Sequence, residues 1–175
     1  MNTDLKLFQS FFLENILILN IENSENSILI KLHSKTKSAI CPYCKKESSG
    51  LHATHHRKIQ DLHVYGKQTW LDIILLEYNC DNPDCKAVTF TETYNGFFNN
   101  YCRMTDRLVQ LVVSLAIETS CESCARILNS LKVKISGDTV IRTILKYYYR
   151  QPKPECGDVI GIDDFALKKD IHTAL

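Results

Sequence analysis

The sequence lacks any long apolar run, and no stretch approaches the roughly eighteen apolar residues that mark a membrane-spanning helix. The N-terminus also lacks a basic region followed by an apolar core and a cleavage site, which argues against a secretory signal. We therefore expect a soluble, cytosolic chain, and disulfides are rare in that compartment. The chain's 8 cysteines then indicate metal ligands and free thiols.

Net charge is also small, at +1 over 175 residues, but it is unevenly distributed. Residues 1–104 carry eleven Lys and Arg against eleven Asp and Glu, residues 105–157 carry eight against five, and residues 158–175 carry two against four. The excess positive charge therefore lies in residues 105–157. A hydrophobic content of 45% is enough to bury a substantial core.

Two short cysteine pairs form the strongest motif of the chain, Cys41-Pro-Tyr-Cys44 and Cys80-Asp-Asn-Pro-Asp-Cys85. A turn with two to four residues between cysteines presents two thiolates at the spacing of half a tetrahedron, so two such turns complete a zinc site. We predict a structural Zn²⁺ bound by Cys41, Cys44, Cys80 and Cys85. Such a closed site leaves no position for a reactive water, so it predicts stability and not catalysis.

Alternatives remain open at these cysteines. They could be four buried thiols or two disulfides, and a histidine from the spacer could replace one of them. The candidate histidines are His52, His55, His56 and His63. The pair Cys121 and Cys124 has no partner pair, so we interpret these two, with Cys102 and Cys156, as ordinary thiols.

The N-terminal half has the pattern of strands. Apolar, β-rich runs at residues 16–21 and 27–32 flank a turn composition and predict a β-hairpin. Further strands are expected at residues 54–61, 69–78 and 88–92, with Gly66 in the turn between the first two, and a short amphipathic helix at residues 4–13. The cysteine pairs would then lie at the ends of a small antiparallel sheet, giving a zinc-ribbon-like β domain within residues 1–95.

The period of the apolar pattern changes from two to 3.6 after a loop composition at residues 95–100, which predicts a helical domain at residues 96–150. Thr105 is expected to cap a first helix, Thr119 and Glu122 to form a capping box for a second, and Ser136 to cap a third. The inward residues are expected to be Leu108, Leu111, Val112 and Leu115, then Cys124, Ala125, Leu128 and Leu131, then Val140, Ile141, Ile144, Leu145 and Tyr148. The fold class is therefore α+β.

Three short helices with a tight connection between the last two are typical of a helix-turn-helix, whose last helix lies in the DNA major groove. Residues 132–153 carry six Lys and Arg against the single Asp138. Such a face can neutralise phosphates and release counterions, whereas the simpler interpretation is an ordinary solvated helix face. The candidate DNA-binding residues are Lys132, Lys134, Ser136, Thr139, Arg142, Lys146 and Arg150.

The C-terminal residues 151–175 predict a linker followed by a strand at 158–166 that ends near Asp163 and Asp164. Carboxylates at a strand end are suited to a hard cation such as Mg²⁺. Because neighbouring side chains on a strand point to opposite faces, only one of the two could enter such a site. On this pattern alone, a solvated turn is the simpler interpretation.

Several of these motifs together resemble the ISL-three family of bacterial insertion-sequence transposases. The resemblance covers nearly the whole chain. The family's zinc-binding N-terminal part resembles the Cys-Pro-x-Cys pair and residues 57–62, 78–85 and 90–92. The family's next two segments resemble residues 120–149 and 160–169. In that family the last strand opens an RNase-H-like catalytic domain whose first acidic residue helps bind two metal ions. By position, that residue would be Asp163.

A two-metal site needs several carboxylates from different strands. The second Asp, the Glu and nearly all of the catalytic domain are absent from this sequence, so the resemblance implies a truncated transposase that is catalytically silent by itself, with Mg²⁺ only in the complete enzyme. The expected function is recognition of the element's terminal repeats in double-stranded DNA, with a homo-oligomer on DNA and a nucleoid-associated, cytoplasmic location. A zinc-ribbon and helix-turn-helix transcription regulator, or a zinc-stabilised interaction module without DNA affinity, are the alternatives.

Overall fold

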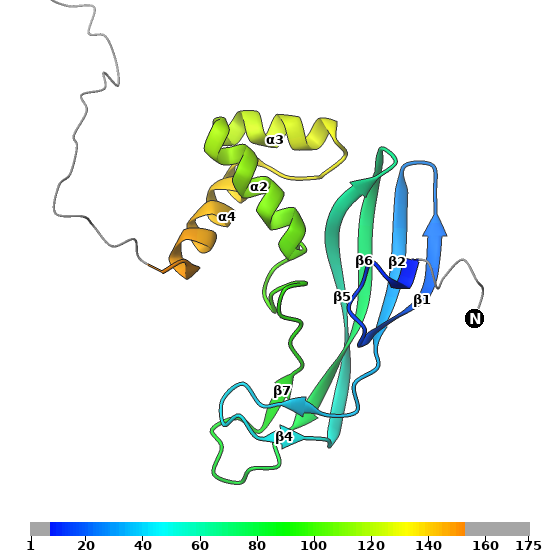
Figure 1. The fold of residues 1–175 in the computed structure, drawn as a ribbon, viewed down its shortest axis with the longest axis vertical. Coiled ribbons are helices and arrows are strands. Elements are labelled where there is room, and N and C mark those ends of the chain that lie inside the picture. Colours follow the sequence, from blue (N-terminus) through cyan, green and yellow to red (C-terminus); the bar gives the residue numbers. More distant parts are fainter. Residues whose placement is uncertain (1–7, 153–175) are drawn as a thin grey trace, which may run out of the picture.

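The computed structural model describes residues 8–152, which form an α+β fold. A five-stranded sheet lies beside three helices, and a two-stranded sheet lies at the lower end of the molecule in Figure 1. The helix expected at residues 4–13 falls partly outside the described residues, and only Phe8 and Gln9 are seen as helical. Asp163 and the strand expected around it lie wholly outside them.

The expected N-terminal hairpin is confirmed, because β1 (Ile16–Asn23) pairs antiparallel with β2 (Ser27–Ser34). The long hairpin of β5 (Leu51–Val64) and β6 (Lys67–Asn79) is also antiparallel. Its turn places Tyr65 and Gly66 at φ 50° and 70°, the left-handed conformation that a two-residue hairpin turn needs at both positions. Gly66 adopts it without the steric cost of a Cβ.

The prediction of an antiparallel sheet was wrong at its centre. The strand order is β1-β2-β6-β5, and β2 pairs with β6 in parallel, with Ile30 opposite Leu71 and Leu32 opposite Ile73. The reason is topological: the chain leaves β2, forms the first cysteine loop and returns along β5, so the hairpin partner β6 runs in the direction of β2. Strand β7 (Thr89–Thr91) then adds antiparallel to the end of β6.

One face of this sheet carries the larger core. Its buried strand residues alternate along the chain, as the pleat requires, and the segment after β7 covers them with Tyr94, Phe97 and Phe98. The buried residues of this core are Ile16, Ile18, Ile30, Leu32, Ile59, Leu71, Ile73, Leu75, Tyr94, Phe97 and Phe98. Residues beyond the expected domain boundary at 95/96 thus belong to the core of the sheet.

The three helices are α2 (Asp106–Glu118), α3 (Cys121–Ser130) and α4 (Gly137–Arg150). The caps at Thr105 and Ser136 are confirmed, since their hydroxyls accept from the backbone N–H groups of Leu108 and Thr139. The cap of α3 was predicted one residue too early, because Ser120 accepts from Ser123 N while Thr119 ends α2. The connection at residues 131–136 is longer than the expected tight turn and buries Val133 and Ile135.

The helical core matches the predicted inward face of α2 and most of that of α3, but not that of α4. Leu108, Val112, Cys124, Ala125 and Leu128 are buried, with Leu111 and Leu115 packed against them. The exposed residues that had been assigned to the core are Leu131, Ile141, Leu145 and Tyr148. On α4 only Val140 and Ile144 of the predicted set pack inward. Thr143 is also buried, so the buried face of α4 lies about one residue earlier around the helix than the predicted face.

A short connection fastens the helices to the sheet edge. The backbone of Gln60 on β5 accepts from Thr105 N at 3.0 Å and donates to Arg103 O at 2.8 Å. The buried carboxylate of Asp61 accepts from Thr105 Oγ1 and from Arg107 Nε, both at 2.7 Å. Hydrogen bonding to this carboxylate, against a smaller opposing effect of burial, raises the pKa of Arg107. The first turn of α2 is thereby held against β5.

Candidate functional site

Both cysteine loops are shaped by backbone hydrogen bonds next to short strands. In the first, β3 (Ala39–Ile40) and β4 (Glu47–Ser48) pair, Cys41 N donates to Lys46 O at 2.9 Å, and Lys45 takes a left-handed φ of 62°. In the second, Cys80 N donates to Val88 O at 2.8 Å. We call these strands, β7 and the two loops the cysteine lobe; it is the lower end in Figure 1.

The four sulfur atoms form one cluster, and all of them lie within 4.8 Å of one another. The Sγ atoms of Cys41 and Cys85 are 3.8 Å apart, and those of Cys44 and Cys80 are 3.6 Å apart. A tetrahedron with metal–sulfur bonds of about 2.3 Å has edges of about 3.8 Å, so the spacing fits one metal ion held by four thiolates. A disulfide would need sulfurs about 2.05 Å apart, and all four cysteines are free.

No histidine joins this cluster among residues 8–152, where it is the sole group of its kind. His55 lies 2.7 Å from a carboxylate oxygen of Glu77, and His56 lies 3.6 Å from one of Asp72, on strands β5 and β6. Hydrogen bonding to His55 and Thr89 lowers the pKa of Glu77. His55 and His56 therefore pair with carboxylates of the sheet and not with the sulfur cluster, and neither His52 nor His63 belongs to that cluster.

The pKa values of two of the clustered thiols shift in opposite directions. A hydrogen bond from the backbone of Lys46, followed by S–H donation from the other cysteines, lowers the pKa of Cys44 to about 6. At Cys80 the backbone of Asn82 also favours the thiolate, but burial and three neighbouring sulfurs outweigh it and raise the pKa to about 12. A cation placed between the sulfurs would relieve this repulsion, which is what a metal ion supplies.

The second feature of interest is a groove of about 1230 Å³ between the β5–β6 ribbon and the helices, which we call the basic groove. One wall is formed by β5, β6 and residues 99–104 and the other by α4 and Lys134, and Asp106, Val109 and Gln110 of α2 also line the groove. Seven Lys and Arg side chains line it, against one carboxylate, Asp106. They are Arg57, Lys58, Arg103, Lys134, Arg142, Lys146 and Arg150.

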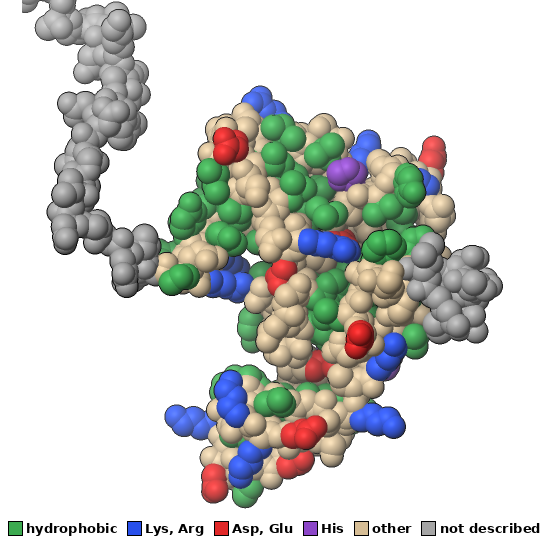
Figure 2. All heavy atoms as spheres, in the orientation of Figure 1, with side chains coloured by type: hydrophobic (Ala, Val, Ile, Leu, Met, Phe, Trp, Pro, Cys, Tyr) green, Lys and Arg blue, Asp and Glu red, His purple; other side chains and the backbone are tan. Residues whose placement is uncertain are grey.

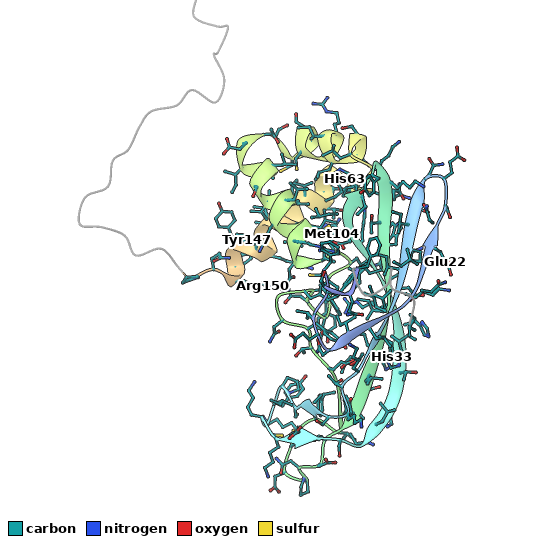
Figure 3. The ribbon with its side chains drawn as sticks, turned by 45° about the vertical axis from the view of Figure 1, so that its right-hand side comes forward. Glu22, His33, His63, Met104, Tyr147 and Arg150 are labelled. Carbon is teal, nitrogen blue, oxygen red and sulfur yellow. The ribbon has the colours of Figure 1, made fainter. Side chains whose placement is uncertain are left out.

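Five of the seven predicted DNA-binding residues line this groove, namely Lys134, Thr139, Arg142, Lys146 and Arg150. Lys132 and Ser136 do not line it: Lys132 takes a left-handed φ of 64° in the connection before α4, and Ser136 caps that helix. Figure 2 shows Lys and Arg side chains at the lower edge of the helical part, and Figure 3 labels Arg150 at the end of α4.

Sequence reasoning did not assign the residues of the opposite wall, which include Lys58, Trp70, Tyr101 and Arg103. The alternation of side chains along β5 indicates that Lys58 points away from the core. Nothing in the sequence, however, predicts that β5 lies close to α4.

Two of the groove's cations are held by the protein itself. Arg57 donates to the backbone oxygens of Cys102 at 2.7 Å and Asn99 at 3.4 Å and lies over the ring of Phe98; burial lowers its pKa. The ammonium of Lys58 lies 5.1 Å from the centre of the Trp70 ring.

The other five cations lack a protein partner, since within residues 8–152 no ion pair or hydrogen bond engages the side chains of Arg103, Lys134, Arg142, Lys146 and Arg150. Five unpaired cations facing one groove favour an anionic ligand.

In the same described part of the chain, no helix is long and apolar enough to cross a membrane. Comparison of the chain with protein-family models, with curated proteins and with solved structures found no match to any of them.

Proposed function

We propose that this chain is a zinc-stabilised DNA-binding module, the N-terminal portion of a transposase of the ISL-three type. The observation that carries the proposal is the basic groove, where seven Lys and Arg side chains meet one carboxylate although the whole chain has a net charge of only +1. Concentrated positive charge with a single carboxylate beside it binds polyphosphate backbones by releasing their counterions.

The role proposed for the cysteine lobe is structural. Its ion is Zn²⁺, which favours four thiolates in a tetrahedron and gains nothing from a fifth ligand. With all four positions taken by Cys41, Cys44, Cys80 and Cys85, the ion has no site for a substrate or a water. Its contribution is to hold two loops that carry little regular structure.

The helices supply most of the proposed DNA contacts. Arg142, Lys146 and Arg150 recur at every fourth residue of α4, so they form a stripe with a rise of about 6 Å between successive cations. Thr139 lies one turn earlier on the same side. In this proposal α3 and α4 act as a helix-turn-helix with an extended connection. Lys132 in that connection and Ser136 at the N-cap of α4 contact the backbone of double-stranded DNA.

The resemblance to transposases supports the biological role. Under this proposal the DNA is the terminal repeats of an insertion sequence, and the protein acts as a homo-oligomer on it, in association with the nucleoid. Strand cleavage would belong to an RNase-H-like part that uses Mg²⁺, and Asp163, outside the described residues, would be its first carboxylate. Residues 8–152 would then serve recognition and not chemistry.

The test is binding of a fluorescently labelled DNA duplex, followed by anisotropy at increasing salt. If the five unpaired cations each neutralise a phosphate, affinity should fall about 500-fold between 50 and 200 mM salt, and about 40-fold for the double variant Arg142→Ala/Lys146→Ala, which removes two of them. The variant should also bind more weakly at every salt concentration.

The matched control is Lys31→Gln/Lys67→Gln, which removes two charges from β2 and β6 outside the groove. It should keep the wild-type affinity and salt dependence. Equal losses in the two double variants would indicate attraction by net charge alone, and binding that does not respond to salt would overturn the proposal.

A further inference from the structure

We infer that the basic groove holds a single unpaired strand of DNA and prefers it to a duplex. This inference rests on the proposed DNA binding and names the form of DNA that the groove takes. It follows from three properties of the groove: its two walls, its aromatic lining and its size.

The two walls limit what can reach the cations of α4. Arg142 and Lys146 line the same groove as Lys58 and Trp70 of the sheet, so the basic stripe of α4 faces another part of the protein across a gap. A single strand is narrower than a duplex, and a positively charged groove between two such walls can follow its phosphates.

Aromatic rings line the groove together with the cations. Trp70 comes from β6, Tyr101 from the segment before α2, and Tyr147 from α4. Tyr101 is 94% exposed, so its ring is available to a ligand. Unpaired bases stack on such rings, whereas the bases of a duplex already stack on one another.

The size of the groove fits a ligand much larger than a small anion. Its 1230 Å³ exceeds the range of about 300–1,000 Å³ typical of small-molecule pockets. Unpaired cations are contributed by residues 99–104, by Lys134 and by three successive turns of α4. A ligand that meets all of them must be long and must repeat its negative charge, as a nucleic acid strand does.

The experiment uses the full chain with its metal and the fluorescence of Trp70, which is the only tryptophan and lies in the groove. A fifteen-nucleotide oligo(dT) and a fifteen-base-pair duplex of mixed sequence are titrated separately, each also carrying a label for anisotropy. We expect oligo(dT) to quench Trp70 and to bind at least about 10-fold more tightly than the duplex at equal salt.

Two tyrosine variants test the stacking. Tyr101→Ala removes a ring that lines the groove, and Tyr149→Ala removes one that is 86% exposed on α4 but does not line it. Tyr101→Ala should weaken oligo(dT) binding by about 5-fold or more, the value of one base stack, and Tyr149→Ala should leave it unchanged. Thermal melting of both variants shows whether either change disturbs folding.

The outcomes separate this inference from the proposed function. A duplex that binds as tightly as oligo(dT) would overturn the preference for a single strand and leave DNA binding intact. Binding of oligo(dT) without quenching of Trp70 would place the strand outside the groove and also overturn the inference. If neither DNA binds, both proposals fail; if oligo(dT) alone binds, the inference stands and recognition of double-stranded ends fails.

Discussion

Removal of the metal ion should unfold the cysteine lobe before the rest of the protein. The hydrophobic cluster at the lobe has four buried residues, Cys41 and Phe90 from the lobe and Leu76 and Tyr78 from β6, and strands β3 and β4 have two residues each. The main sheet has its own core of eleven buried residues that contains no cysteine. The four sulfurs are therefore the main cross-link between the two loops, assisted by Ser48 Oγ, which accepts from Asp81 N at 3.0 Å.

The size of the effect follows from mass action. Zinc present at 1,000 times its dissociation constant stabilises the folded lobe by about 4 kcal/mol. Structural zinc sites can contribute more, because the apo peptides are often unfolded. The expected result of chelation is an early, separate transition in circular dichroism, followed by unfolding of the main sheet.

The measurement combines thermal melting with metal analysis. Purified protein should contain about one zinc per chain, with zinc–sulfur distances near 2.3 Å by X-ray absorption. Cys41→Ser should reproduce the effect of chelation, and Cys102→Ser, outside the cluster, serves as the matched control and should melt as wild type. A melting curve that is unchanged by chelation, or protein that folds without any metal, would refute the reasoning.

Two further predictions concern buried carboxylates. The carboxylate of Glu92, which is 4% exposed, accepts from Ser34 Oγ at 2.8 Å, Thr36 Oγ1 at 2.7 Å and Leu76 N at 2.8 Å. Glu92→Ala leaves these three donors unpaired. It should therefore lower the free energy of unfolding, measured by urea melts, by about 2–3 kcal/mol. Glu25→Ala at an exposed turn is its control, and equal stability of the two variants would contradict the role of Glu92. Asp61→Ala should cost about 3 kcal/mol, because it removes the buried partner of Thr105 and Arg107. Glu22→Ala breaks an exposed ion pair with Lys31 and should have no measurable effect; a similar loss in both would show that Asp61 does not fasten the helices.

Local patterns predicted the parts of the fold that depend on neighbouring residues. The spacing within each cysteine pair was enough to predict the cluster, because thiolates two to four residues apart can share one ion. The N-terminal hairpin followed from two β-rich runs around a polar turn, and the caps at Thr105 and Ser136 followed from the chemistry of a helix start. The contacts that decide the hairpin and the helix caps lie within a few residues of one another along the chain. The meeting of the two cysteine pairs is different, because it brings together distant segments.

The failures concern contacts between distant segments. The parallel pairing of β2 with β6 depends on the return path through the first cysteine loop, which no pattern within either strand records. The buried face of α4 was assigned by hydrophobicity, but Ile141 and Leu145 are exposed and Thr143 is buried. The sequence pattern predicted one wide apolar face on α4, and the packing against α2 and α3 buries only the side of it that carries Val140 and Ile144.

The groove is the clearest case of a site that only tertiary structure creates. The sequence placed the cations of α4 on a helix face but gave no indication that Lys58, Trp70 and Arg103 lie opposite them. This opposition depends on Gln60 and Asp61, which hold residues 103–107 at the edge of β5. The side-chain amide of Gln60 also faces the backbone N–H and C=O of Lys134 at 2.7 and 3.0 Å, which ties the second wall to the first.

The positions of the metal cluster and the groove on β6 determine how the two can influence each other. Trp70 and Cys80 are ten residues apart, so the extended strand separates them by about 33 Å. The ties that hold the groove together run through Gln60, Asp61 and Arg107 and not through the cysteines. Over that distance surface charges are largely screened at physiological salt, because the Debye length is about 8 Å. We therefore predict that loss of a metal ion would affect the proposed DNA binding only through the stability of the end of β6, and that substitutions in the walls of the groove would change the affinity of the folded protein.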